Sequence, residues 1–127
     1  EKNNKKYKKK DMITLLHCNT AYPTPAENSN LGSILNLKKR FKRTSGYSDH
    51  TIGTKIPLLG VAAGATLIEK HFTLDVNSEG PDHAMSADPQ TLSELVQGIR
   101  WLEEVLGARE MGARDAEKGA LSFRRPS

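Results

Sequence analysis

Residues 46–82 read GYSDHTIGTKIPLLGVAAGATLIEKHFTLDVNSEGPD, and the order of elements in this stretch decides the fold. His50 and His71 each close a short apolar segment, and a run of small and apolar residues with helical spacing lies between them. A strand–helix–strand order makes the two strands parallel neighbours, with the loops that follow them on one side of the sheet. Because neighbouring strands lie about 4.8 Å apart, we predict that the two imidazoles lie close enough to share one metal ion.

Short apolar runs predict strands at residues 12–17, 45–48 and 66–72. Successive side chains of a strand point to opposite faces. The two faces of the last strand are therefore predicted to carry Leu67, Glu69 and His71 on one side and Ile68, Lys70 and Phe72 on the other. We expect the second, more apolar set to meet the helices and the first set to line an interior or a site.

A helix is expected after each of these strands. Asn28 or Asn30 is predicted to cap the first helix, and Thr54 the second. Asp88 followed by Pro89 is a strong start for the third. The apolar faces of the first and third helices are predicted to be Leu31, Ile34, Leu37 and Phe41, and Leu92, Leu95, Val96, Ile99, Leu102 and Leu106.

The element order β-α-β-α-β-α predicts an α/β fold with a parallel sheet, and both a βα-barrel and an open doubly wound sheet fit this order. Three strands are few for a parallel sheet that must be covered on both faces. One edge would be open where further strands are expected. We therefore expect this chain to be part of a larger structure.

The composition excludes several classes of protein. The 127 residues include no apolar run of the roughly 18 residues that a membrane span needs. No nucleotide-binding glycine motif is present, and the single cysteine, Cys18, excludes an internal disulfide framework and fits a reducing, cytoplasmic compartment. Much of the net charge of +4 lies in residues 1–11, which we interpret as an exposed basic segment in preference to a nucleic-acid-binding tail.

The histidine pair is the strongest candidate for chemistry. Taken singly, His50 and His71 each fit a structural histidine, a catalytic base or a metal ligand. As a pair at the ends of successive strands they are better explained as ligands of one ion. Two neutral imidazoles leave positions for water or substrate, as a catalytic metal requires, but two nitrogens do not distinguish zinc, manganese and iron.

Two carboxylates accompany the histidines in sequence. Asp82 lies in the loop motif GPDH and is either an ordinary turn residue or a group that meets a substrate hydroxyl or the metal. Glu69 precedes His71 by two residues and shares its predicted face. It either orients a ligand or pairs with a lysine inside a barrel.

Three smaller candidates complete the set. Ser48 shares the face of His50 and can donate to an anionic group. Tyr22 lies on a loop fixed by prolines and suits the wall of a substrate site, although simple packing explains it as well. Cys18 fits a small buried residue better than a nucleophile.

Four motifs in this order resemble the sialic acid synthase (N-acetylneuraminate synthase) family. They are LLHCNTAYPTP at 15–25, GYSDHTIG at 46–53, AAGATLIEKHFTLD at 62–75 and GPDHAMSADP at 80–89. Pseudaminate, legionaminate and spore-coat polysaccharide synthases share the pattern. The resemblance runs from about Ile13 to the end of the chain.

The resemblance implies a (β/α)8 TIM barrel, with residues 12–107 as the carboxyl-terminal part of its catalytic domain and about its last three βα units. It implies that residues 108–127 form a linker toward an antifreeze-like domain, in an enzyme that works as a domain-swapped homodimer. Such enzymes condense phosphoenolpyruvate with N-acetylmannosamine or a related N-acylated amino sugar. The products are a nonulosonic acid and phosphate, and the cofactor is divalent manganese or magnesium.

Carried over by motif, the resemblance assigns a role to each candidate. It implies that His50 and His71 are the metal ligands and that Asp82 contacts the sugar near the reacting aldehyde. Glu69 belongs to the motif that precedes the second histidine. The substrate-binding residues are Tyr22 for the sugar, Ser48 for phosphoenolpyruvate, and either Asn19 or Thr20 in the place of a family asparagine.

A non-catalytic alternative stays open at this point. The family's phosphate-binding lysines, several serines and an arginine from the partner's second domain are not in these 127 residues. We therefore expect this chain to be inactive alone. The second interpretation is a metal-binding fragment or pseudoenzyme of the same fold, and sequence upstream with a glutamate and lysines at strand ends would favour the enzyme.

Overall fold

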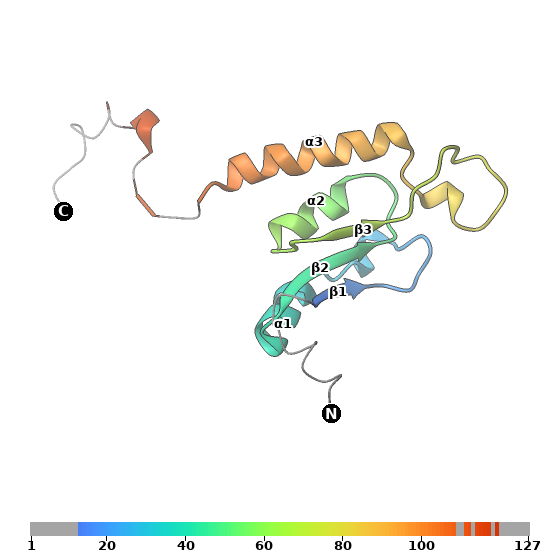
Figure 1. Ribbon diagram of the computed structural model, residues 1–127, viewed down its shortest axis with the longest axis horizontal. Helices are drawn as coiled ribbons and strands as arrows, with labels where there is room; N and C mark the ends of the chain where they lie inside the picture. Colours follow the sequence, from blue (N-terminus) through green and yellow to red (C-terminus); the bar gives the residue numbers. More distant parts are fainter. Residues whose placement is uncertain (1–12, 109–110, 113, 118, 120–127) are drawn as a thin grey trace, which may run out of the picture.

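A computed structural model describes residues 13–108, 111–112, 114–117 and 119. These residues form a three-stranded parallel sheet in which a helix follows each strand (Figure 1). The elements are β1 (Thr14–Cys18), α1 (Gly32–Phe41), β2 (Thr44–Asp49), α2 (Lys55–Ala62), β3 (Ile68–Lys70) and α3 (Pro89–Leu106). The predicted α/β class and element order are thus confirmed. The basic segment at 1–11 lies outside the described residues, as does much of the predicted linker at 108–127.

The core lies between the sheet and the first two helices. Ile34 of α1 and Tyr47 of β2 are fully buried and form one cluster with Ala65. The helix α2 approaches β2 closely at Gly60, where an added Cβ atom would lie 3.2 Å from the Tyr47 ring. The helix α3 packs on α2 (Figure 1). The described helices therefore gather on the face of the sheet to which Tyr47 points.

The sheet order is β1-β2-β3, so sequence neighbours are also neighbours in space. In the ladder between β2 and β3, Ser48 pairs with Glu69, and Asp49 pairs with Lys70. The strand β3 is shorter than the predicted range 66–72, and at its carboxyl end its pairing stops where β2 ends. Phe72 was expected to meet the helices, but it lies beyond the end of the ladder and is 52% exposed.

The predicted asparagine caps of the first helix are wrong. Asn28 ends a short 3-10 turn, and Asn30 has a positive φ of 44° that places it in a turn before the helix. Leu31 occupies the capping position without a side-chain hydrogen bond. Of the predicted apolar face, Ile34 is buried, whereas Phe41 at the helix end is half exposed.

The starts of the other two helices are as predicted. Thr54 occupies the capping position of α2, although its side chain makes no capping hydrogen bond. The Asp88 carboxylate caps α3 by accepting a hydrogen bond from the Thr91 amide at 2.7 Å. None of the helices in the described ranges is long and apolar enough to span a membrane.

Candidate functional site

The two histidines lie one residue beyond the ends of neighbouring strands, His50 after β2 and His71 after β3. Their ring centroids are 5.2 Å apart and the ring planes are inclined by 63°. His50 is 6% exposed, whereas the side chain of His71 is 37% exposed. The structure therefore places both imidazoles together at one end of the sheet, as the strand–helix–strand pattern predicted.

The loop after β1 brings a third ring to the pair. The centroid of the Tyr22 ring lies 4.1 Å from that of His50 and 6.1 Å from that of His71. This loop is attached to β2, because the Thr24 amide donates to the His50 carbonyl oxygen at 2.8 Å. Tyr22 therefore lies beside the histidine pair, and its role in the wall of a substrate site stays a prediction.

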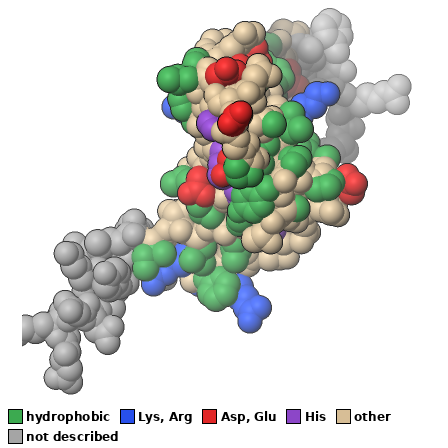
Figure 2. Space-filling view, turned by 90° about the vertical axis from the view of Figure 1, so that its right-hand side faces the viewer, with side chains coloured by type: hydrophobic (Ala, Val, Ile, Leu, Met, Phe, Trp, Pro, Cys, Tyr) green, Lys and Arg blue, Asp and Glu red, His purple; other side chains and the backbone are tan. Residues whose placement is uncertain are grey.

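The loop after β3 brings a carboxylate. One carboxylate oxygen of Asp82 lies 3.9 Å from Nδ1 of His71, and the Asp82 side chain is 52% exposed. The loop is tied back to β3, because the Ala87 amide donates to the His71 carbonyl oxygen at 2.8 Å. In the view of the end toward which the strands run, histidine side chains appear beside acidic ones (Figure 2). Asp82 therefore belongs to the same site.

Ser48 and Glu69 pair in the sheet ladder, and each lies two residues before a site histidine. The Ser48 hydroxyl donates to a carboxylate oxygen of Glu69 at 2.6 Å. The alternative that Glu69 pairs with a lysine is not what the described residues show, because the neighbouring Lys70 points to the other face and binds Asp49. Both polar side chains of this rung thus face the site side and bind each other.

The loop geometry separates the two candidates for the asparagine position. The side-chain nitrogen Nδ2 of Asn19 donates to the Asn28 carbonyl oxygen at 3.0 Å, and the side-chain oxygen Oδ1 of Asn19 accepts from the Ala21 backbone amide at 2.9 Å. Asn19 therefore shapes its own loop, whereas Thr20 is exposed. Cys18 was expected to be buried but is exposed, with its sulfur 3.9 Å from Nδ1 of His50.

Comparison with known proteins places this arrangement in a family. Residues 3–111 match the model of the NeuB family. The chain belongs to the NeuB family. It is 51% identical over 109 residues to the uncharacterized protein MJ1065 of Methanocaldococcus jannaschii, covering 86% of this chain and 32% of that protein. It is 46% identical over 119 residues to N,N'-diacetyllegionaminic acid synthase of Campylobacter jejuni, covering 94% of this chain and 36% of that one.

A solved structure gives the same answer for the fold. The N-acetylneuraminic acid (sialic acid) synthetase of Leptospira borgpetersenii, solved with citrate, superposes with a TM-score of 0.82 at 39% identity. The match covers 87% of this chain and 39% of that chain. The predicted family and the predicted fold class, three βα units of a larger barrel, are confirmed. The NeuB-family chain spans about a third of the length of the curated relatives it matches.

Sequence reasoning missed the buried polar residues of this NeuB-family chain. Asp49 and Lys70 form an ion pair at 2.6 Å on the helix side of the sheet. His17, in the family motif, donates from Nε2 to the Ser29 carbonyl oxygen at 2.8 Å, and its ring stacks on Tyr47 on the helix side of the sheet. The sequence contained a signal for the ion pair. A charged residue, Asp49 or Lys70, directly precedes each site histidine, and strand alternation places that residue on the face opposite to the histidine.

The buried Tyr47 hydroxyl belongs to the same helix-side environment. Burial, reinforced by the nearby Asp49 carboxylate, raises the pKa of Tyr47 to about 12. Tyr47 is therefore a neutral core residue at physiological pH.

The donor set fits a divalent transition ion. Within the described ranges, no group of three or more His, Cys, Asp and Glu side chains has the geometry of a metal site. The two imidazoles of His50 and His71, with the Asp82 carboxylate beside one of them, nevertheless present nitrogen and oxygen donors from three chain segments. Magnesium prefers oxygen ligands in octahedral geometry, whereas imidazole suits transition ions. The two imidazoles therefore fit a divalent transition ion better than magnesium, and they do not distinguish among zinc, manganese and iron.

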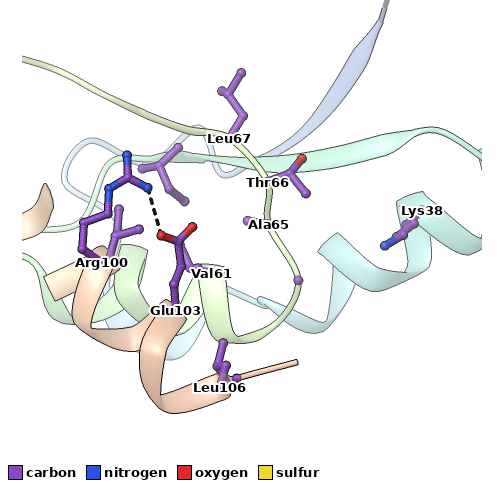
Figure 3. A pocket seen from close by; sticks show the side chains of 12 residues that line it. Lys38, Val61, Ala65, Thr66, Leu67, Arg100, Glu103 and Leu106 are labelled. Carbon is purple, nitrogen blue, oxygen red and sulfur yellow. Dashed lines mark hydrogen bonds and ion pairs between the residues drawn. The ribbon is translucent and has the colours of Figure 1, made fainter. Parts of the chain in front are cut away.

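A hollow of about 710 Å³ lies at the end of β3 opposite to the histidines (Figure 3). Residues that line it include Lys38, Val61, Ala65, Thr66, Leu67, Arg100, Glu103 and Leu106. Its two most closely placed charged groups, Arg100 and Glu103, bind each other at 2.9 Å. The hollow contains none of the predicted site residues, so its size does not make it the candidate site.

Proposed function

We propose that this chain supplies the metal-binding and sugar-binding part of a NeuB-family enzyme that condenses phosphoenolpyruvate with an N-acylated amino sugar. The product is a nonulosonic acid, with release of phosphate. The observation that carries the proposal is the meeting of His50, His71, Tyr22 and Asp82 at one end of the sheet in a chain of this family. The homodimer implied by the resemblance and the cytoplasmic location inferred from the single cysteine stay predictions.

The histidine pair is proposed to hold the divalent ion, Mn²⁺ in preference to Mg²⁺. A bound divalent ion supplies Lewis-acid polarisation of a carbonyl oxygen. His50 is nearly buried and His71 is partly open, so the pair is anchored on one side and accessible on the other. The two rings come from neighbouring strands, which gives them a rigid support.

The loops after β1 and β3 are proposed to bind the sugar. Tyr22 offers an aromatic face next to His50, and the Asp82 carboxylate next to His71 can accept hydrogen bonds from sugar hydroxyl groups. Half of the Asp82 side chain is open to solvent, so a hydroxyl can reach it without displacing a buried partner. Both groups flank the histidine pair, which would place the aldehyde end of an open-chain sugar beside it.

Ser48, Glu69 and Thr20 are proposed to face phosphoenolpyruvate. The Ser48 hydroxyl now donates to Glu69, and it can turn to donate to an anionic substrate group. Glu69 then accepts from another donor, which fits a role in orienting groups in the site. Of the two candidates for the place of the family asparagine, Thr20 is proposed, and the engagement of the Asn19 side chain within its own loop supports this choice.

The proposed reaction balances without a redox partner. The methylene carbon of phosphoenolpyruvate forms a bond to the sugar aldehyde carbon, and the aldehyde oxygen gains a proton. Water adds to the adjacent C2 carbon as a hydroxyl group, and the proton it loses balances the one gained by the aldehyde oxygen. The bond from C2 to the phosphate oxygen then breaks, the C2 hydroxyl gives its proton to the departing phosphate, and C2 becomes the keto carbon of the product. The chain's share of catalysis is to hold two reactants in contact, and proximity of this kind lowers barriers by several kcal/mol.

A segment exchange tests the proposal. Residues 13–108 of this chain would replace the matching segment of the Campylobacter jejuni synthase, with which the chain shares 46% identity. We expect the chimera to form nonulosonic acid from phosphoenolpyruvate and the acylated sugar in the presence of Mn²⁺. His50→Ala or His71→Ala in the chimera should lower the rate by at least a hundredfold, measured as phosphate release.

The control is Arg100→Met, which removes an exposed ion pair far from the histidines and should leave the rate unchanged. A folded chimera that keeps its activity without either histidine would refute the proposal. The 127-residue chain alone, under the same conditions, is expected to yield no product above the blank.

A further inference from the structure

The ion pair between Asp49 and Lys70 is the most buried charged contact described in this chain. The Lys70 ammonium lies 2.6 Å from a carboxylate oxygen of Asp49, and the two side chains are 4% and 0% exposed. It lies on the helix side of the sheet, below the strand ends. The proposed reaction uses neither residue.

The pair also holds the residue after His50. Lys70 donates a second hydrogen bond to the Thr51 carbonyl oxygen at 2.6 Å. The other carboxylate oxygen of Asp49 accepts from the Thr51 amide at 3.1 Å and from the Thr51 hydroxyl at 2.8 Å. The backbone on both sides of His50 is therefore bound to a single side-chain network that starts on β3.

The position of the pair in the ladder is informative. Asp49 and Lys70 form the last paired rung of β2 and β3, and each is followed directly by a site histidine. Beyond that rung the two histidine carbonyl groups bind different loops, through the Thr24 amide and the Ala87 amide. The backbone ladder itself therefore does not fix the distance between the two rings. The ion pair between Asp49 and Lys70, one residue earlier in each strand, can fix it.

Stability alone does not explain this pair. Desolvation of two buried charges offsets much of their attraction, so apolar residues of similar volume often give equal or greater stability. The ion pair restricts the orientation of the groups around it, because the short contact and the three hydrogen bonds to Thr51 permit few arrangements of these side chains. His50 and His71 directly follow the two residues of the pair, so a fixed arrangement of the pair restricts the positions of their rings.

We propose that Asp49 and Lys70 are positioning residues that set the separation of the His50 and His71 rings, and through it the affinity of the histidine pair for a divalent cation. The statement about cation affinity rests on the proposed function. The statement about ring separation does not, because it concerns the protein without metal.

The test compares the 127-residue chain with the variant Asp49→Leu/Lys70→Met, which replaces the ion pair by apolar groups. Two quantities are measured: the nuclear Overhauser effect between the ring protons of His50 and His71 without metal, and the Kd for Mn²⁺ from electron paramagnetic resonance. We expect a midpoint of urea unfolding close to that of the original chain. The ring contact should be lost, and the Kd should rise by about tenfold to a hundredfold.

Two further variants separate positioning from loss of stability. Ile34→Ala removes core volume elsewhere and should lower stability while both the ring contact and the Kd are kept. Lys70→Arg keeps the charge and should keep more of the ring contact than Lys70→Met does. A purely structural role would instead make ring contact follow stability in all variants.

The outcomes are distinguishable. If Asp49→Leu/Lys70→Met keeps both the ring contact and the Kd, the proposal is overturned. If the original chain does not bind Mn²⁺, the cation site of the proposed function fails, and the ring contact alone then decides the positioning role. If the apolar variant does not fold, Asp49→Glu, which lengthens the acid by one methylene group, takes its place, and an unchanged ring contact in that folded variant overturns the proposal.

Discussion

Both faces of the β2–β3 pair carry polar side chains, but the exposure and the hydrogen bonding of these side chains differ between the two faces. On the helix face, Asp49 and Lys70 are almost fully buried and are bound to each other and to Thr51. At the open end of the other face, the side chains of His71 and Asp82 are 37% and 52% exposed and lie 3.9 Å apart. The buried charged groups Asp49 and Lys70 are bound to each other and to Thr51, whereas the His71 and Asp82 side chains are open to solvent and can form further hydrogen bonds with a ligand.

The lesson is that burial alone does not identify the functional residues of this chain. The buried pair Asp49–Lys70 is predicted to be positional, whereas the proposed ligand groups range from His50, which is 6% exposed, to Asp82, whose side chain is 52% exposed. Substitutions on the two faces should therefore separate stability from ligand binding. The following predictions concern the free energy of unfolding of the 127-residue chain, obtained from urea denaturation followed by circular dichroism.

The largest effect is expected on the helix face. Asp49→Ala leaves the buried Lys70 ammonium without its partner, which should lower the free energy of unfolding by about 3–5 kcal/mol. The matched control is Arg100→Ala, which breaks the exposed pair with Glu103 and should cost at most about 1 kcal/mol. Equal losses in the two variants would contradict the distinction between the faces.

A smaller loss is expected for Gly46→Ala in β2. An added Cβ atom would lie 2.6 Å from a methyl group of Leu16 and closer still to the backbone oxygen of Leu67. Overpacking of this kind costs about 1–3 kcal/mol. In Gly32→Ala, where nothing lies within 4 Å, the same methyl group should be neutral or stabilising. A tolerated alanine at position 46 would show that the strands can separate there.

The capping carboxylate of α3 should give a smaller, pH-dependent effect. The Thr91 amide, donating to the Asp88 carboxylate, lowers the pKa of Asp88 below its ordinary value of 3.8. Because the pKa is lower in the folded state, the stabilisation is complete above the unfolded-state pKa and is lost as the pH falls through the folded-state pKa. Asp88→Asn should remove this part of the acid sensitivity below about pH 4; an unchanged acid profile would argue against the cap.

The smallest effect on stability is expected at the open face. His71→Ala removes a partly exposed ring and should change the free energy of unfolding by less than about 0.5 kcal/mol. The same variant should lose Mn²⁺ binding, measured by electron paramagnetic resonance, if the histidine pair is a metal site. A large loss of stability together with unchanged Mn²⁺ binding would reverse the assignment of the two faces.

Much of this arrangement was predictable because it depends on local pattern. The spacing of His50 and His71 around one helical segment predicted two parallel strands with both rings at the same end, and the rings lie 5.2 Å apart. Asp88 before Pro89 predicted the start of α3, which the Thr91 hydrogen bond confirms. Motif order predicted the family, and the match over residues 3–111 confirms it.

Other features were decided only in three dimensions. The length of β3 was overestimated because a strand ends where its partner ends, and the end of β2 is not written in the sequence of β3. The choice between Asn19 and Thr20 depended on a contact with Asn28, in a turn nine residues later than Asn19. The exposure of Cys18 depended on which elements cover β1.

The sequence by itself determined the order of elements, the family and the set of side chains that meet at the strand ends, because alternation and helical spacing are properties of consecutive residues. The tertiary structure decided which of those side chains have free hydrogen-bonding capacity. The pairs Asp49–Lys70 and Ser48–Glu69 form across neighbouring strands, between residues 21 positions apart. Alternation predicts the face on which each of these side chains lies, but the partner it meets there is set by strand register and packing.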